Sequence, residues 1–195
     1  DVYAAIIADL KAGELDLPDV PAQYGRPTRW ASKSLLAEVY LTTGDFTEAK
    51  RKSEEVIASN KFNLLEGRKA DDYNNIFGAS ANGTVEEIFY LKYSHLSGWQ
   101  WPHNMLFVGT QYSPFGNYVL FGKLDNKFLN NWDKNDLRKQ FGIFTEYINR
   151  AGNVVSLPSS TPVQFCKFRD PDAPTNTGHA NDYPFLRYAD VLMIH

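Results

Sequence analysis

Aromatic and polar side chains are interspersed at high density between residues 94 and 122. Within this stretch Trp99 and Trp101 lie beside Gln100, His103 and Asn104. Flat rings can stack on the apolar C–H faces of a sugar, while nearby amides bind its hydroxyl groups by hydrogen bonds. The candidate ligand-binding residues are Trp99, Trp101, Asn104, Tyr112 and Tyr118.

A second interpretation of these rings stays open, in which they form a local cluster that packs a long loop onto neighbouring helices. A stretch of this length without a regular period is usually functional or disordered. Its ring content argues against disorder. Trp99 and Trp101 favour the ligand site, because in a strand they would point to the same face.

Catalytic chemistry has little support in the sequence. A glycosidase needs two carboxylates held a fixed distance apart. Glu86 with Glu87 and Asp133 with Asp136 are candidates, but neighbouring acids are common on solvated surfaces. The four histidines have no metal-ligand spacing, and neither a nucleophile elbow nor a phosphate-binding loop occurs. We therefore predict no catalytic residue, no metal ligand and no cofactor.

Composition limits the kinds of partner. The chain has 195 residues, of which 43% are apolar and 22% charged, as is usual for a folded domain. A net charge of -3 provides no broad basic field for nucleic acid and no polybasic membrane patch. No apolar run approaches the roughly 20 residues that span a bilayer. The single cysteine, Cys166, is expected to be a small buried apolar residue.

The elements that would hold the candidate site begin with helices. Apolar periodicity predicts a helix over Val2–Leu10, with Gly13 as a stop signal. Two further helices are predicted over residues 28–43 and 46–59, separated by Gly44 and Asp45. Helices joined by so short a turn must lie antiparallel and share a core.

This helix pair fits the tetratricopeptide pattern between residues 33 and 57. Small Ala37 and Ala49 would let the two helices approach closely, and Tyr40 and Phe46 would fill the space beside them. Such a unit cannot bury its apolar face alone and needs neighbouring helices.

Several polar residues have expected structural roles. Asp45 should cap the second helix of the pair. Lys52 should face solvent with the other charged residues of that helix. Arg187 and Asp190 are three positions apart on a later helix and should pair.

Beyond residue 60 the predicted elements are shorter. Residues 86–93 alternate like a strand, and residues 123–132 resume a helical period. A strand is expected within residues 141–149, followed by a turn at residues 151–153. A new helix is expected to begin at Tyr183.

Together these elements predict a mainly α fold: an α-α superhelix with tetratricopeptide-like helix pairs and long, aromatic-rich loops. Residues 1–60 would form the scaffold, residues 61–182 a loop-rich insert with the ligand site, and residues 183–195 the start of a further scaffold helix. The pattern is that of a single domain cut at both ends.

Six sequence blocks resemble the SusD-like (RagB-like) family of nutrient-binding outer-membrane lipoproteins from Bacteroidetes. Asp182–Met193 is the most specific of them, and it accompanies the helix pair that contains Gly44 and Asp45. The blocks are YAAIIADLKAGELDLP, GRPTRWASKSLLAEVYLTTGDFTEAKRKSEEVI, NKFNLL, VEEIF, NDLRK and DYPFLRYADVLM.

The resemblance implies a non-catalytic role in polysaccharide utilisation and nutrient uptake. Such a protein captures an oligosaccharide at the cell surface and passes it to a TonB-dependent, SusC-like outer-membrane transporter. Attachment to the outer membrane would use a lipid anchor that this chain does not contain. Two alternatives stay open: capture of a peptide by the same fold, or a tetratricopeptide adaptor for protein partners.

Overall fold

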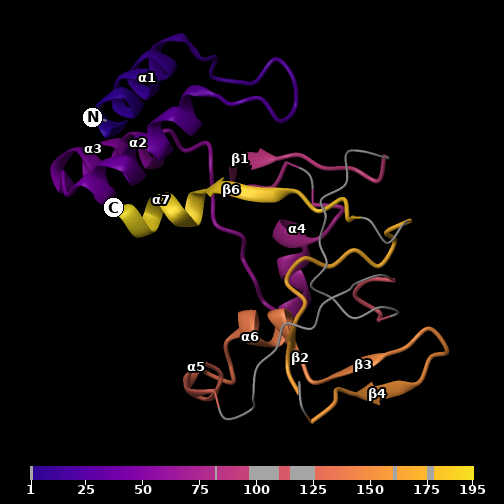
Figure 1. Ribbon diagram of the computed structural model, residues 1–195. Coiled ribbons are helices and arrows are strands. Elements are labelled where there is room, and N and C mark those ends of the chain that lie inside the picture. Colours follow the sequence, from indigo (N-terminus) through magenta and orange to yellow (C-terminus); the bar gives the residue numbers. More distant parts are fainter. Residues whose placement is uncertain (1, 82, 97–109, 115–125, 160–161, 175–177) are drawn as a thin grey trace. The chain divides into compact units, whose positions relative to one another are not determined.

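Helices account for most of the regular structure in the residues that can be described. The computed structural model describes residues 2–81, 83–96, 110–114, 126–159, 162–174 and 178–195 (Figure 1). Its helices are α1 (Val2–Asp16), α2 (Arg29–Thr43), α3 (Phe46–Ala58), η1 (Ala70–Tyr73), α4 (Asn74–Phe77), α5 (Lys127–Asn131), α6 (Leu137–Gly142) and α7 (Tyr188–Ile194). Its strands are β1 (Glu87–Leu91), β2 (Ile143–Phe144), β3 (Glu146–Ile148), β4 (Val154–Ser156), β5 (Gln164–Phe165) and β6 (Tyr183–Arg187).

The expected mainly helical class is confirmed, whereas a superhelix of repeated pairs stays a prediction. The chain forms two units, each with its own contacts. The first unit comprises Asp1–Leu65, Gly83–Leu91 and Pro184–His195, and the second comprises Glu66–Asn82 and Lys92–Tyr183. No helix of the described residues is long and apolar enough to cross a membrane.

The predicted helix pair is present as α2 and α3. Gly44 follows α2 with a φ of +82°, a left-handed conformation that glycine adopts without strain. The next residue, Asp45, caps α3 as expected, since its carboxylate accepts a hydrogen bond from the N–H of Glu48 at 3.2 Å. This short turn makes the two helices antiparallel.

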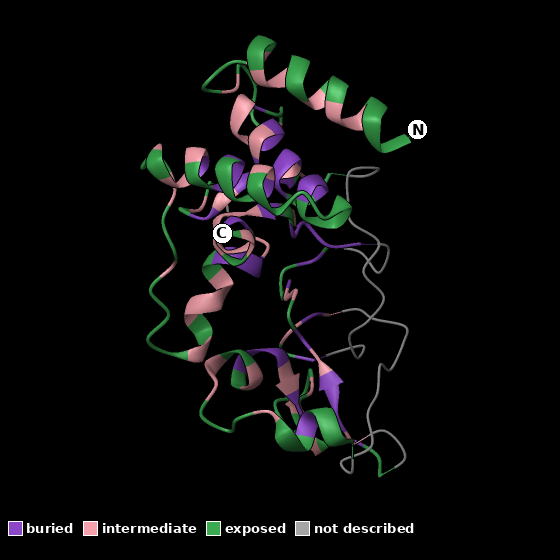
Figure 2. Cartoon of the chain, turned by 90° about the vertical axis from the view of Figure 1, so that its left-hand side faces the viewer, coloured by how far each residue is buried: buried purple, intermediate pink, exposed green. Residues whose placement is uncertain are grey.

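Helix α1 packs beside the pair through one face. Ile7 and Leu10 contact a buried cluster of Leu36, Tyr40 and Ala49. The rest of α1 stays open to solvent, and none of its residues is buried (Figure 2). The apolar stripe of α1 is therefore narrow, and burial there stabilises the helix only modestly.

A second cluster in the first unit joins the helix pair to β1 and β6, which pair in a two-stranded sheet. Its members come from segments far apart in the sequence. They are Ala31, Val56, Ile88, Leu186 and Val191. The predicted alternation of β1 is confirmed, because Ile88 and Tyr90 are buried and their neighbours are more open.

Several details of the first unit differ from the sequence-based expectations. Helix α1 continues through Gly13, where a Cβ atom would lie 2.8 Å from the hydroxyl oxygen of Ser32, so this glycine allows a close approach to α2. Phe46 is 67% exposed, because it occupies the first position of α3 outside the core. The helix expected at Tyr183 begins five residues later, since residues 183–187 pair with β1 as strand β6.

The second unit contains short antiparallel strand pairs. Strand β2 pairs with β5, and β3 pairs with β4 in a hairpin that places Tyr147 opposite Val155. The predicted turn of this hairpin is present, with Gly152 at a φ of +83°. The expected strand over residues 141–149 is interrupted, because α6 extends to Gly142 before β2 begins.

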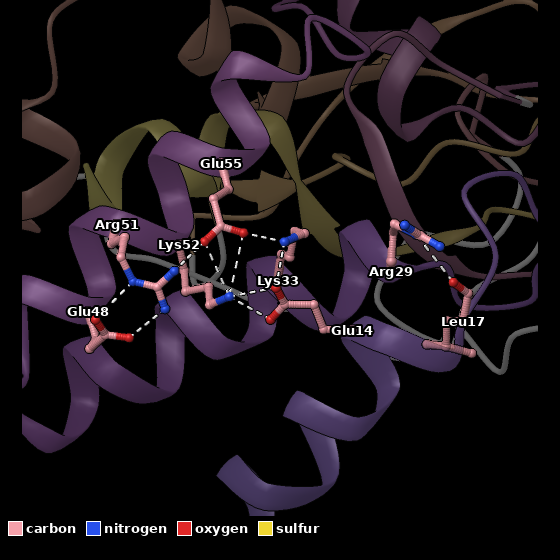
Figure 3. A network of polar contacts seen from close by, with 8 residues as sticks. All are labelled: Glu14, Leu17, Arg29, Lys33, Glu48, Arg51, Lys52 and Glu55. Carbon is pink, nitrogen blue, oxygen red and sulfur yellow. Dashed lines mark hydrogen bonds and ion pairs between the residues drawn. The ribbon is translucent and has the colours of Figure 1, made fainter.

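Lys52 is buried, contrary to the expectation that it faces solvent. The helical period places it on the same face as Ala49, Ser53 and Val56. Its ammonium group lies 2.5 and 2.6 Å from the two carboxylate oxygens of Glu14 on α1 (Figure 3). A buried ammonium group needs such a partner, because desolvation without one is costly.

The contact between Glu14 and Lys52 belongs to a larger polar network. Lys33 of α2 donates to Glu14 at 2.6 Å and also to Glu55 of α3 (Figure 3). Glu55 also forms an ion pair with Arg51, and Arg51 forms a second ion pair with Glu48. Burial raises the pKa of Glu14, but the hydrogen bonds from the two lysines outweigh it, so the net pKa lies below its usual value.

Replacing Glu14 by glutamine should destabilise the first unit. The ammonium groups of Lys33 and Lys52 would lose their shared partner, and we expect the free energy of unfolding to fall by about 3 kcal/mol in chemical denaturation. Glu54→Gln is the matched control. Glu54 is 52% exposed and lies 3.7 Å from Lys50, so its loss should change the free energy by less than about 0.5 kcal/mol. Equal effects of the two variants would contradict the assigned role.

The same contact predicts a pH dependence of stability. The pKa of Glu14 is lowered in the folded protein relative to its usual value of 4.5. A group of this kind stabilises the fold above its unfolded pKa, and the contribution is lost as the pH falls through the folded pKa. The stability difference between wild type and Glu14→Gln should therefore be full at pH 7 and shrink progressively below about pH 4.5. Denaturation curves from pH 7 to pH 3 measure it, and a difference that does not decrease would refute the linkage.

Candidate functional site

A cavity of about 710 Å³ lies in the second unit beside Tyr112. Its lining is mainly polar and comes from segments around residues 71–80, 111–112 and 169–172. This volume lies in the range of small-molecule binding pockets. The lining residues are Asp71, Asn74, Gly78, Ala79, Ser80, His95, Gln111, Tyr112, Gln140, Arg169, Asp170, Pro171 and Asp172.

Tyr112 is held firmly at the edge of this cavity. Its ring packs against Phe144 with a centroid distance of 5.0 Å, in a cluster with Leu157 and Cys166. Its carbonyl oxygen accepts a hydrogen bond from the N–H of Asp170 at 2.9 Å. Burial raises the pKa of the Tyr112 phenol, so the hydroxyl group stays protonated at neutral pH. The ring is thus a fixed group with a neutral hydroxyl.

Arg169 fixes Tyr112 from another direction. Its guanidinium carbon lies 4.5 Å from the centre of the Tyr112 ring and 4.1 Å from that of Phe141. The guanidinium also donates to the carbonyl oxygens of Phe141 and Cys166 and pairs with Asp71 at 3.2 Å. One side chain thereby joins η1, α6 and the residues around Tyr112.

Cys166 is buried, as the sequence predicted. Its thiol donates to the carbonyl oxygen of Phe141 at 3.2 Å. Burial raises the pKa of this thiol, which keeps it in the unreactive protonated form. The residue therefore contributes to packing below Tyr112.

Asp170 brings a buried carboxylate to the cavity wall. It is 1% exposed, and one of its oxygens accepts from the N–H of Ala180 at 2.8 Å. The same oxygen lies 2.9 Å from Nε2 of His95. No sequence spacing connects residue 95 with residue 170, so only the fold reveals this pair.

A second imidazole lies deeper in the same unit. His179 is 1% exposed, and its Nε2 lies 2.8 Å from the hydroxyl oxygen of Ser113. Burial lowers the pKa of His179, which favours the neutral ring. This histidine supports the segment that follows Tyr112.

A second, smaller cavity has a volume of about 370 Å³. Gln111 and Tyr112 line both cavities. The remaining wall comes from the strands β2, β3 and β4. It consists of Ile143, Phe144, Thr145, Glu146, Tyr147, Ile148 and Val154.

Of the five candidate ligand-binding residues, Tyr112 lies at both cavities. The other four fall outside the described residues. They are Trp99, Trp101, Asn104 and Tyr118. Sequence reasoning missed Arg169, Asp170 and His95, because their roles depend on partners that are distant in the chain.

The neighbouring acids considered for catalysis have structural partners. Glu86 accepts a hydrogen bond from the N–H of Leu65 at 2.9 Å. Asp136 accepts from Arg138 and from the indole N–H of Trp132 at 2.8 Å. The hydrogen bond from Arg138 is the main reason that the pKa of Asp136 lies well below its usual range. Within the described ranges, no three metal-binding side chains are grouped around one point.

The chain combines a helical first unit with a second unit that contains a cavity lined by polar residues and a fixed aromatic ring. Similarity to known proteins narrows this class. The chain is 27% identical over 215 residues to "SusD-like protein P2" of Formosa agariphila, and the match covers all of this chain and 42% of that protein. No protein-family model matches the chain.

Solved structures share the fold. Surface glycan-binding protein A from Bacteroides uniformis superposes with a TM-score of 0.69 at 22% identity, over 99% of this chain and 43% of that one. Surface glycan-binding protein A from Bacteroides thetaiotaomicron in complex with laminarihexaose gives a TM-score of 0.70 at 16% identity, over 98% and 48%. This chain spans less than half the length of each relative. The expected resemblance is confirmed: the chain is similar in sequence to a SusD-like protein and shares its fold with solved surface glycan-binding proteins.

Arg169→Met should loosen the wall of the larger cavity. The variant removes the contacts to Asp71 and to two carbonyl oxygens, and we expect the free energy of unfolding to fall by about 3 kcal/mol. Arg68→Met is the control, because Arg68 is 85% exposed and pairs at 3.2 Å with an equally open Glu66. Its effect should stay below about 0.5 kcal/mol in the same urea titration. If Arg169→Met proved as harmless as the control, Arg169 would not organise the cavity.

Proposed function

We propose that this protein binds an oligosaccharide at the bacterial cell surface without cleaving it. The observation that carries the proposal is the polar cavity beside Tyr112 in a chain that is SusD-like throughout its length. The two solved structures named above are surface glycan-binding proteins, one of them in complex with laminarihexaose. Amide, hydroxyl and carboxylate groups around a fixed ring suit the many hydroxyl groups of a sugar.

The proposed ligand-binding residues are Tyr112 together with Trp99, Trp101, Asn104 and Tyr118. Tyr112 contributes its hydroxyl group at the cavity edge. The two tryptophans would supply the flat platforms on which sugar rings stack.

The bound oligosaccharide is then delivered to a TonB-dependent, SusC-like transporter of the outer membrane. The support for this step is the SusD-like character of the chain. In the full-length protein a lipid anchor would hold the binding scaffold at the membrane surface, next to the transporter. Capture without turnover fits this role, because hydrolysis at the binding site would release the ligand before transfer.

Replacing Trp99 and Trp101 together by alanine should abolish glycan binding and leave the fold intact. Stacking on two aromatic rings contributes strongly to sugar affinity, so we expect at least about a hundredfold weaker retention in affinity gels that contain laminarin or other polysaccharides. Product analysis of the same samples should show no cleavage. Trp132→Ala serves as the control, because Trp132 packs on Phe128 in α5 and lies in neither cavity lining.

The outcomes separate the alternatives. Unchanged retention of the double variant would remove the tryptophans from the site. Cleavage products would show a hydrolase. Binding of peptides in place of every glycan would assign peptide capture to this fold.

A further inference from the structure

Carboxylates outnumber cations in the two cavities that meet at Gln111 and Tyr112. Among the described residues that line them, the acids are Asp71, Asp170, Asp172 and Glu146, and the basic side chains are Arg169 and His95. Surplus negative charge at a binding site repels anionic ligands at short range. The excess of acidic over basic side chains therefore affects which glycans can bind in the two cavities.

Arg169 is poorly placed to bind an anion, because four of its five N–H groups have partners. Its Nε donates to the carbonyl oxygen of Cys166 at 3.1 Å, and Nη1 pairs with Asp71. Its Nη2 donates to the carbonyl oxygen of Phe141 and contacts the Cys166 sulfur. The side chain is 12% exposed, and its flat face covers the rings of Tyr112 and Phe141. A sulfate or carboxylate would have to break these contacts to reach it.

His95 is similarly occupied by Asp170, at 2.9 Å. Even a protonated His95 would be balanced by this buried carboxylate. The remaining acids lie open to a ligand: Asp172 and Glu146 are exposed, and the Asp71 side chain is 73% exposed. Because Asp71 pairs with Arg169, the surplus negative charge that an approaching glycan meets comes from Asp172 and Glu146.

The other polar groups of the lining suit an uncharged chain. Asn74, Gln140 and Gln111 carry amides that both donate and accept hydrogen bonds, as sugar hydroxyl groups require. Carboxylates also accept hydrogen bonds from hydroxyl groups strongly. Gln111 and Tyr112 belong to both linings, so a ligand bound at either cavity contacts this shared segment.

We propose that this two-cavity site selects uncharged oligosaccharide chains and rejects uronate-rich or sulfated ones. The selectivity rests on the proposed function, because it assumes that a glycan occupies the site. It comes from the acids Asp172 and Glu146 beside a guanidinium that already pairs with Asp71.

The test compares uncharged polysaccharides with anionic ones by isothermal titration, using derivatives of the same backbone for two of the comparisons. Laminarin is paired with laminarin sulfate, hydroxyethyl cellulose with carboxymethyl cellulose, and mannan and xylan with alginate and polygalacturonate as natural anionic chains. For the pair that binds, the anionic member should bind at least about tenfold more weakly at low salt. The difference in affinity between the uncharged and the anionic polysaccharide should become smaller at higher salt, because salt screens the charges.

A double variant, Asp172→Asn with Glu146→Gln, assigns the selectivity to the site. At low salt this variant should raise the affinity for the anionic polysaccharide, relative to that for the uncharged one, by about tenfold. Glu66→Gln removes an exposed acid of the same unit that lines neither cavity, and it should leave the ratio unchanged.

Each outcome decides a different point. Tight binding of an anionic chain would overturn the selectivity while leaving glycan capture intact. An equal shift with Glu66→Gln would show that overall charge, not the site, sets the ratio. Binding to no glycan of either kind would overturn both the selectivity and the proposed function.

Discussion

The Arg169 guanidinium is the group on which the candidate site depends. It stacks on Tyr112 and Phe141 while it donates to backbone carbonyl oxygens and pairs with Asp71. Its contacts with Tyr112, Phe141 and Asp71 reach segments that are remote in sequence. A planar cation with five donors can satisfy rings, carbonyl groups and a carboxylate together, which lysine cannot. One side chain therefore organises the cavity wall, and its positive charge is balanced by its pairing with Asp71.

A buried charged group also organises the first unit. Glu14 receives hydrogen bonds from Lys33 and Lys52, which come from two different helices (Figure 3). Buried ion pairs add little net stability compared with apolar packing, but removing one partner is costly. Helix α1 has a narrow apolar contact through Ile7 and Leu10. The position of Glu14 on the same face therefore sets where α1 lies along the pair.

Local patterns in the sequence predicted the elements and the local Arg187–Asp190 pair, which is present at 2.7 Å, but not the long-range charged contacts. The turn at Gly44 and Asp45 was predictable, because each residue type has a specific backbone role at a helix end. The burial of Lys52 was not, since a lysine among charged neighbours normally faces solvent, and its partner lies 38 positions away. Tyr112 was identified by its aromatic setting. Arg169 was missed because no local pattern distinguishes a guanidinium that will become buried.

The way in which Arg169 holds Tyr112 also constrains how a ligand can contact this ring. The guanidinium covers one face, and Phe144 lies tilted against the ring at 46°. A sugar cannot use Tyr112 as a platform open on both faces, so it must approach the remaining surface or the hydroxyl group. Because burial raises the pKa of that phenol, the hydroxyl group remains able to donate a hydrogen bond at neutral pH. Tyr112 therefore fits the role of a directional hydrogen-bonding residue, and stacking in the proposed site would depend on other rings such as those of Trp99 and Trp101.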